Sequence, residues 1–297
     1  MSTPPDQPNR NARHRAEHHP IAIGFIRKVF AVLGVVAPDL GGRLATRIFR
    51  TPRRHQTPAF EQEIRAKAAR HDTVEHEGMR LDVLEWGAGE RAVLLVHGWE
   101  GRGTHLGRFV EPLVAAGFRV VAFDGPAHGQ SEGKRTDVIT FSSSLHTMAS
   151  QKGPFYAAIG HSFGGATTLF AAHCGLALER AVIIAAPSQV AYVAGRFREA
   201  VGLPDAVFER HLHHLGRCFG MSVESADVNR FVEKLDIKGM VVHCRDDAEI
   251  EVEQGERLHR AWPGSKMLAT SGLGHRRVLK EPEVIGAVVA FLSGQTD

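Results

Sequence analysis

The sequence contains few cysteines, and none of them is placed to form a disulfide framework or a metal site. The three cysteines, Cys174, Cys218 and Cys244, are widely spaced and odd in number. A disulfide framework uses an even set of cysteines, and a zinc or redox site often contains a Cys-x-x-Cys pair. Neither pattern is present, so we expect a reducing compartment and predict a cytoplasmic protein.

Long apolar runs and nucleic-acid-binding motifs are missing as well. The most apolar stretch, residues 21–37, is short and is interrupted by Arg27 and Lys28, so it does not predict a membrane span. The N-terminus lacks the small-residue cleavage site of a signal peptide. Basic and aromatic residues do not interleave along a groove-sized segment, and no zinc or helix-turn-helix spacing is present. We therefore expect no nucleic-acid partner.

The positive charge of the chain is concentrated near its N-terminus. Residues 1–54 hold ten Arg and Lys against three Asp and Glu, a local charge of +7. The remaining residues hold 26 basic and 30 acidic side chains, so a basic arm precedes a mildly acidic body. Residues 1–20 of this arm are polar and proline-bearing, and we predict that they form a disordered tail.

Residues 21–70 predict a helical extension in front of the main domain. Ile21–Phe49 has the periodicity of two amphipathic helices broken near Pro38, and Ala59–Arg70 is a third helical run. We favour packing of these helices on the body of the protein. The alternative, a peripheral contact of residues 21–54 with a membrane surface, stays open.

From residue 71 to residue 297, strand patterns alternate with helical ones. Thr73–His76 and Met79–Trp86 flank a Glu-Gly turn and predict a β-hairpin. Further strands are predicted at 91–96, 119–123, 155–159, 181–185, 240–243 and 266–269. Helices are predicted at 104–116, 136–152, 163–174, 252–261 and 281–292. This order predicts an α/β domain, residues 71–297, with a mostly parallel eight-stranded sheet and helices on both faces.

One interval, residues 188–238, has helical periodicity but no strand pattern. We predict that it is a helical lid inserted above the carboxyl edge of the sheet, where open α/β folds bind their ligands. His211, His213 and His214 cluster in this interval, and an i, i+3 pair on one helix can chelate a metal. No carboxylate or cysteine stands at ligand spacing, so we interpret the cluster as a polar helix face and predict no metal.

The sequence Gly160-His161-Ser162-Phe163-Gly164 lies between a predicted strand and a predicted helix. A Gly-x-Ser-x-Gly nucleophile elbow requires this context. The tight turn leaves no room for side chains at positions 160 and 164. It also holds the Ser162 hydroxyl near the start of a helix, whose N–H groups favour negative charge. Ser162 is therefore our candidate nucleophile.

Four segments of the chain occur in the order that one enzyme superfamily shows. They are His97-Gly98-Trp99, the loop from Asp124 to Ser131, the elbow, and a late aspartate and histidine. In these segments the chain, from about residue 72 to 293, resembles the α/β-hydrolase fold superfamily. The resemblance covers roughly three quarters of the chain and excludes the N-terminal arm.

The resemblance implies roles for residues near the start of the sheet. In the family, the backbone N–H just after the His-Gly pair and the N–H after the nucleophile form the oxyanion hole, which here implies Trp99 and Phe163. His97 and Asp124 precede Ser162 in the chain. The acid and base of this fold follow the nucleophile, so we interpret both as structural.

Two histidines follow the elbow and qualify as the general base. His259 lies inside a helical pattern and is interpreted as a surface residue, whereas His275 ends the segment Ser271-Gly-Leu-Gly-His. That segment is predicted to be a flexible loop between the last strand and the last helix. Such a loop can bring an imidazole over the sheet to Ser162, so His275 is our candidate base.

The candidate acid lies in the segment His243-Cys-Arg-Asp246-Asp247. Family members often read His-x-x-x-Asp-x-x-Val here, and this spacing implies Asp247 as the acid. Asp246 would then point to Arg245 or to solvent. Cys244 departs from the usual residue at its position, so a displacement of the loop by one residue, with Asp246 as the acid, stays open.

The resemblance implies a serine hydrolase that cleaves a carboxylic ester through a Ser-His-Asp triad and an acyl-enzyme, without a cofactor. The apolar residues of the lid favour a small-molecule ester with a hydrophobic acyl chain or a small aromatic group. An acyltransferase, a thioesterase or a carbon–carbon bond hydrolase on the same triad stays open. A non-catalytic binding protein is the remaining alternative. The sequence does not specify the oligomeric state.

Overall fold

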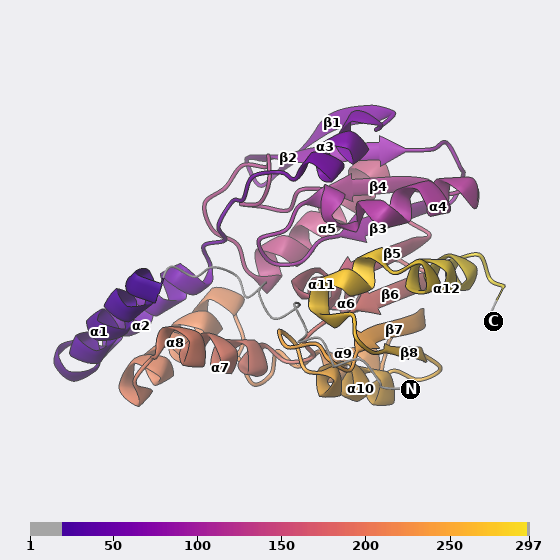
Figure 1. The fold of residues 1–297 in the computed structure, drawn as a ribbon. Helices are drawn as coiled ribbons and strands as arrows, with labels where there is room; N and C mark the ends of the chain where they lie inside the picture. Colours follow the sequence, from indigo (N-terminus) through magenta and orange to yellow (C-terminus); the bar gives the residue numbers. More distant parts are fainter. Residues whose placement is uncertain (1–19, 296–297) are drawn as a thin grey trace, which may run out of the picture.

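An eight-stranded sheet lies at the centre of the computed structural model, which describes residues 20–295 (Figure 1). The strand order is β1-β2-β4-β3-β5-β6-β7-β8. The strands are β1 (Arg70–His76), β2 (Met79–Trp86), β3 (Ala92–Val96), β4 (Arg119–Phe123), β5 (Ala157–His161), β6 (Arg180–Ile184), β7 (Lys238–Cys244) and β8 (Lys266–Thr270). The pairs β1–β2 and β2–β4 are antiparallel and all others are parallel, which confirms the predicted sheet with a hairpin at its edge.

Helices cover both faces of this sheet. They are the 3-10 helix η1 (Gly103–Phe109), α4 (Val110–Ala115), α5 (Val138–Lys152), α6 (Phe163–His173), α10 (Val252–Ala261), α11 (Gly274–Arg277), the 3-10 helix η2 (Val278–Lys280) and α12 (Pro282–Leu292). In β3, Val93 and Leu95 face the apolar cluster that contains η1, α4 and α12, whereas Leu94 and Val96 face the cluster on the side of α5. Because side chains alternate along a strand, a strand between two helical layers is apolar throughout.

Three helices and no strand lie within residues 188–236, the interval that we call the lid. It consists of α7 (Val190–Val201), α8 (Asp205–Phe219) and α9 (Val228–Val232). An apolar cluster lies beneath it, in which Val138, Phe170, Leu215 and Phe219 are buried. Phe163, the residue after Ser162, packs against the same cluster. The lid core therefore lies directly beside the elbow.

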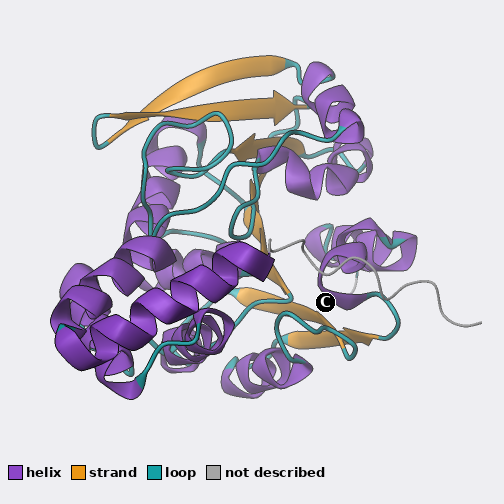
Figure 2. Ribbon diagram, turned by 60° about the vertical axis from the view of Figure 1, so that its left-hand side comes forward, coloured by secondary structure: helices purple, strands orange, loops and turns teal. Residues whose placement is uncertain are grey.

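The N-terminal extension packs mainly on the lid. It comprises α1 (Pro20–Val36), α2 (Pro38–Phe49) and α3 (Ala59–Ala66). Phe30 and Ala45 are buried against Leu203 and Val207, which belong to the lid. A Cβ atom on Gly42 would lie 2.4 Å from Arg210 Cβ, so α2 and α8 approach each other as closely as their backbones allow. Helices α1 and α2 form an arm beside the sheet together with α7 and α8 (Figures 1 and 2).

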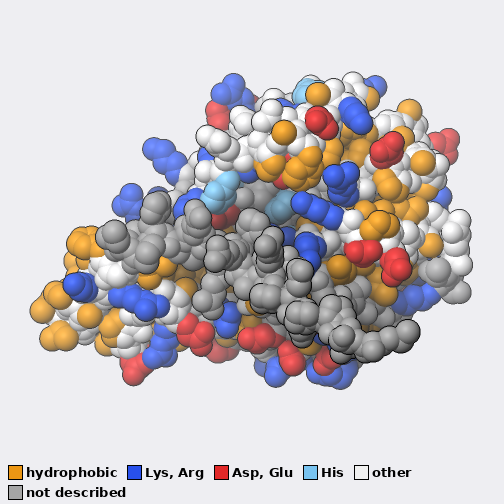
Figure 3. All heavy atoms as spheres, in the orientation of Figure 1, with side chains coloured by type: hydrophobic (Ala, Val, Ile, Leu, Met, Phe, Trp, Pro, Cys, Tyr) orange, Lys and Arg blue, Asp and Glu red, His pale blue; other side chains and the backbone are white. Residues whose placement is uncertain are grey.

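Packing of the extension on the lid leaves one face of α1 exposed. Its outward side chains are apolar, with Phe25 69% and Val35 85% exposed. Apolar side chains gather at the outer end of the arm (Figure 3). Among the described residues, no helix combines the length and apolarity needed to cross a bilayer. The membrane-surface contact remains a prediction. The predicted disordered tail lies outside the described residues, except for Pro20, which begins α1.

Candidate active site

The elbow is a strained turn between β5 and α6. Ser162 has φ 54° and ψ −124°, a backbone conformation that non-glycine residues rarely adopt. A Cβ atom on Gly160 would lie 2.7 Å from Gly164 O, and one on Gly164 would lie 2.3 Å from His97 O. Both glycines are therefore required by the close approach of α6 to the sheet, as the sequence predicted. The turn is held by the Ser162 N–H, which donates to Ile184 O at 2.8 Å.

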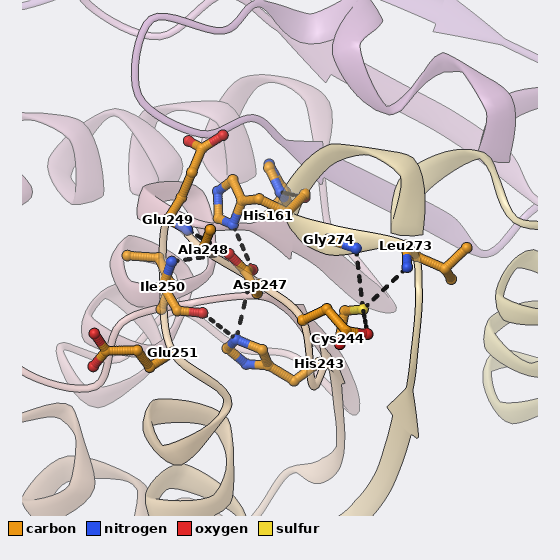
Figure 4. Close-up of polar contacts among 12 residues, drawn as sticks. His161, His243, Cys244, Asp247, Ala248, Glu249, Ile250, Glu251, Leu273 and Gly274 are labelled. Atoms are coloured by element: carbon orange, nitrogen blue, oxygen red, sulfur yellow. Dashed lines mark hydrogen bonds and ion pairs between the residues drawn. The ribbon is translucent and has the colours of Figure 1, made fainter. Parts of the chain in front are cut away.

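His275 and Asp247 meet in a buried contact above the carboxyl ends of β7 and β8. The distance from His275 Nδ1 to Asp247 Oδ2 is 2.7 Å, and the two side chains are 7% and 0% exposed. The other oxygen of Asp247 accepts the N–H groups of Glu249 and Ile250, each at 2.9 Å (Figure 4). Because a carboxylate only accepts, Nδ1 of His275 donates the proton in this contact, and Nε2 is left for a further partner.

The segment before His275 is more ordered than the sequence predicted. It was expected to be a flexible loop, but His275 lies in the one-turn helix α11. Cys244 Sγ accepts the N–H of Leu273 at 3.3 Å and that of Gly274 at 3.0 Å (Figure 4). Asp246 is exposed to solvent, as one of the two expectations had it, and it accepts the N–H of Gly272 rather than pairing with Arg245. These acceptors fix the backbone from which the imidazole extends.

The sequence did not identify Cys244 and His161 as contributors to the site. Cys244 is fully buried, and its only signal in the sequence was its departure from the family pattern. His161 Nε2 lies 3.0 Å from His275 O, and the two rings are 4.7 Å apart. Burial holds the pKa of His161 well below its usual value, so the ring is neutral and donates to that carbonyl. Its position between Gly160 and Ser162 was the available signal.

His97 and Asp124 support the loops on the other side of the elbow. His97 Nε2 accepts the Gly125 N–H at 2.9 Å, and burial holds the pKa of His97 well below its usual value. Asp124 accepts the N–H groups of Gly103 and Gln130, each at 2.7 Å. Burial raises the pKa of Asp124 to about 6. These contacts agree with the structural interpretation of both residues.

Trp99 and Phe163 lie next to each other beside Ser162. Their rings are 5.4 Å apart, and a Cβ atom on Gly98 would lie 3.0 Å from Ser162 Cβ. Neither the Trp99 N–H nor the Phe163 N–H donates to another described group. Two backbone donors beside a serine can stabilise an oxyanion. Among the described residues, no hydrogen bond joins Ser162 to His275, whereas neighbouring His161 contacts His275 directly.

The remaining candidate histidines lie away from this site. His259 is on α10 and contacts Ser265 Oγ at 2.8 Å. In the lid, His211 is buried with Nδ1 2.9 Å from Thr46 Oγ1, and His214 contacts Asp39 at 3.0 Å. Within the part of the chain that the structure describes, no three His, Cys, Asp or Glu side chains are arranged to hold a metal ion.

Comparison with known proteins agrees with this geometry. Residues 93–288 match the model of the alpha/beta hydrolase family. A pimeloyl-[acyl-carrier protein] methyl ester esterase of Neisseria meningitidis is 25% identical over 247 residues, which span 70% of this chain and 78% of the esterase.

Solved structures show the same fold. A bromoperoxidase from Bacillus anthracis superposes with a TM-score of 0.60 at 19% identity, covering 75% of this chain and 99% of the bromoperoxidase. An esterase from Exiguobacterium antarcticum gives 0.59 at 17% identity, covering 75% and 99%. With a family match that spans most of the sheet and its helices, the chain belongs to the alpha/beta hydrolase family.

Proposed function

We propose that the protein is a serine esterase with Ser162 as nucleophile, His275 as general base and Asp247 as the acid that orients the base. The observation that carries the proposal is the buried 2.7 Å contact between His275 Nδ1 and Asp247 Oδ2, in a hydrolase whose Ser162 lies at a strained elbow. The carboxylate holds the imidazole in the tautomer that leaves Nε2 free to accept a proton. Asp246 instead accepts the Gly272 N–H, which supports Asp247 over Asp246 in this role.

The reaction follows from these positions. His275 Nε2 takes the proton of the Ser162 hydroxyl while Oγ attacks the acyl carbon, and the same proton then passes to the departing alcohol. Water attacks the acyl-enzyme with His275 again as the base, releasing the acid and regenerating Ser162. The N–H groups of Trp99 and Phe163 stabilise the oxyanion, and one such donor contributes about 3 kcal/mol to transition-state stabilisation.

The apolar residues of the lid favour a substrate that carries a hydrophobic acyl chain or a small aromatic group. Phe163 belongs both to the elbow and to the edge of the lid's apolar cluster, so a group bound at Ser162 lies beside that cluster. The Neisseria relative is named for hydrolysis of a methyl ester on an acyl chain. An ester of this kind is therefore our proposed substrate class.

We also propose that the protein is located in the cytoplasm. The three thiols are free, and the buried Cys244 sulfur is a hydrogen-bond acceptor in the site. A cytoplasmic, reducing environment is compatible with this use.

The test is labelling by a fluorophosphonate probe together with ester turnover. Ser162→Ala should abolish labelling and lower turnover by about a million-fold, as for other triad nucleophiles. Ser150→Ala, at an exposed serine on α5, is the matched control and should behave as wild type. Esters of graded acyl length, with and without an alcohol acceptor, then distinguish hydrolysis from acyl transfer. A wild-type protein that is neither labelled nor active would be a binding protein and would contradict the proposal.

A further inference from the structure

A cleft of about 370 Å³ lies between α2, α8 and the segment that precedes α5. It is remote in sequence from the elbow and contains none of the proposed catalytic residues. Five arginines and one histidine line it, and they are Arg43, Arg47, Arg50, Arg135, Arg217 and His214. On α2 and its C-cap the arginines are four and three residues apart, which places them on one face of the helix.

The described carboxylates do not balance this charge. Asp39 pairs with Arg43 at 2.9 Å and with His214 at 3.0 Å, and Asp137 pairs with Arg50 at 2.7 Å. Neither aspartate lines the cleft. Five guanidinium groups therefore face two carboxylates, an excess of three positive charges.

Three of the guanidinium groups have no anionic partner within the described residues. No described carboxylate lies within 4.0 Å of the guanidinium of Arg47, Arg135 or Arg217. The helix C-termini next to Arg47 and Arg217 favour positive charge, but Arg135 lies outside any helix. Helix dipoles therefore do not account for the whole cluster.

One side of the cleft, at Arg50, is fixed by contacts within the chain, of which the ion pair with Asp137 is one. Arg50 also donates to Cys218 Sγ at 3.2 Å, and its backbone carbonyl accepts the Thr136 N–H at 2.9 Å. Asp137, its ion-pair partner, caps the N-terminus of α5. The Nε of Arg50 is buried and has no hydrogen-bond partner among the described residues. A guanidinium that is already held in place lowers the ordering cost of binding an anion.

We propose that this cleft binds a phosphoryl group. A guanidinium presents parallel N–H donors that match two oxygens of a phosphate, and several arginines together match a dianion better than separate surface lysines would. Two sources carry this chemistry, a soluble phosphorylated small molecule and the head group of an anionic lipid. The exposed apolar face of α1, on the same arm, makes the lipid source testable. The binding is independent of ester hydrolysis.

The test is calorimetric titration of the whole protein with inorganic phosphate at low ionic strength, where charge interactions are least screened. Arg47→Gln combined with Arg217→Gln should weaken binding at least tenfold. The matched control, Arg70→Gln combined with Arg257→Gln, removes the same charge from exposed positions outside the cleft and should change the Kd less than twofold. Absence of wild-type binding, or equal weakening in the control, would overturn the proposal.

A third variant distinguishes weaker phosphate binding from a folding defect. Arg135 lies outside any helix, so Arg135→Gln leaves the packing of α2 on α8 intact. It should weaken phosphate binding about threefold at an unchanged melting temperature. An unchanged Kd for this variant would count against the cleft.

Vesicles then identify the source of the phosphoryl group. With a lipid source, the protein should sediment with vesicles of phosphatidylcholine and phosphatidylglycerol but not with phosphatidylcholine alone. Val32→Asp combined with Val35→Asp, on the exposed face of α1, should abolish sedimentation while phosphate binding persists. With a soluble source, glycerol 3-phosphate should compete with phosphate and no vesicle should sediment the protein. If glycerol 3-phosphate does not compete and no vesicle sediments the protein, the proposal fails even where inorganic phosphate binds, whatever the esterase assay shows.

Discussion

The carboxyl edge of the sheet and the helical arm differ in whether their charged groups have partners within the chain. At the sheet edge, both oxygens of Asp247 have partners within the chain, one in His275 and the other in backbone N–H groups. On the arm, arginines without described anionic partners line a cleft, and apolar side chains of α1 face outward. The first region pairs its buried carboxylate within the chain, whereas the second has guanidinium groups without a described anionic partner.

The largest expected effect on turnover comes from replacing Asp247, the proposed acid. Asp247→Asn should lower turnover by about ten-thousand-fold, because an amide at this position favours the wrong tautomer of His275. Asp246→Asn is the matched control. It should lose less than about tenfold, since its contact with the Gly272 N–H only supports the backbone before His275. Turnover of the two purified variants decides this, and a crippled Asp246→Asn enzyme would show that the acid is displaced by one residue.

A second prediction compares two truncations of the arm. Removal of residues 1–54 takes away Phe30 and Ala45 and exposes Leu203 and Val207, which are buried beneath them. The loss of several buried side chains should lower the melting temperature by about 10 °C or leave the protein insoluble. Removal of residues 1–19 alone should have little effect. Soluble yield and melting temperature measure both, and equal tolerance of the two truncations would contradict the packing of α1 and α2 on the lid.

A third prediction uses the histidines buried around the elbow. Burial lowers the pKa of His105 and of His128 to about 4 and holds those of His97 and His161 well below the usual value. In the unfolded chain these groups take up protons near pH 6.5. The unfolded state therefore gains protons first as the pH falls. The stability that these residues contribute above pH 6.5 should decline progressively toward pH 4.

Asp124 acts in the opposite direction over part of this range. Its pKa is raised to about 6, so the folded state takes up this proton before the unfolded state does as the pH falls. One carboxyl does not offset four histidines, and the free energy of unfolding should fall from pH 7 to pH 5. Denaturant titrations at several pH values measure it. A stability that is flat or rises over this interval would contradict the assignment of neutral buried histidines.

The smallest effect is expected for Cys244. Cys244→Ala removes the acceptor of two backbone N–H groups that precede His275, and it should lower turnover by about tenfold through misplacement of the imidazole. Cys174→Ala, at an exposed thiol, is the matched control and should leave turnover unchanged. If both variants have wild-type turnover, the sulfur contacts do not position the base.

Local patterns in the sequence were sufficient to predict the sheet, because a buried strand between helices is a short apolar run with helices on either side. The same patterns were less accurate for the ends of helices and strands, where pairing between distant parts of the chain decides. The third helix was expected to continue to Arg70, but it ends at Ala66 because Arg70 pairs with Glu85 in β2. The strand before the elbow was expected at 155–159 and lies at Ala157–His161, because its last residues pair with β6.

The strained turn was predicted from the sterics of the elbow, whereas the pairing of Asp247 with His275 was implied by the family resemblance. The supporting contacts could not be predicted, since Cys244 and Leu273 are far apart in the sequence and meet only when β7 pairs with β8. The arginine cleft was missed for the same reason. Its residues come from three segments, and the sequence showed only that the N-terminal arm is basic.

The covalent intermediate provides the most direct test of the central claim. A slowly hydrolysed aryl ester, acid-quenched during turnover and digested, should leave its acyl group on the peptide that contains Ser162. The mass shift of that peptide should equal the acyl group minus one hydrogen, and it should be absent in Ser162→Ala. An acyl group found on a cysteine or on another serine, or an active enzyme in which no peptide is acylated, would contradict the proposed serine esterase mechanism.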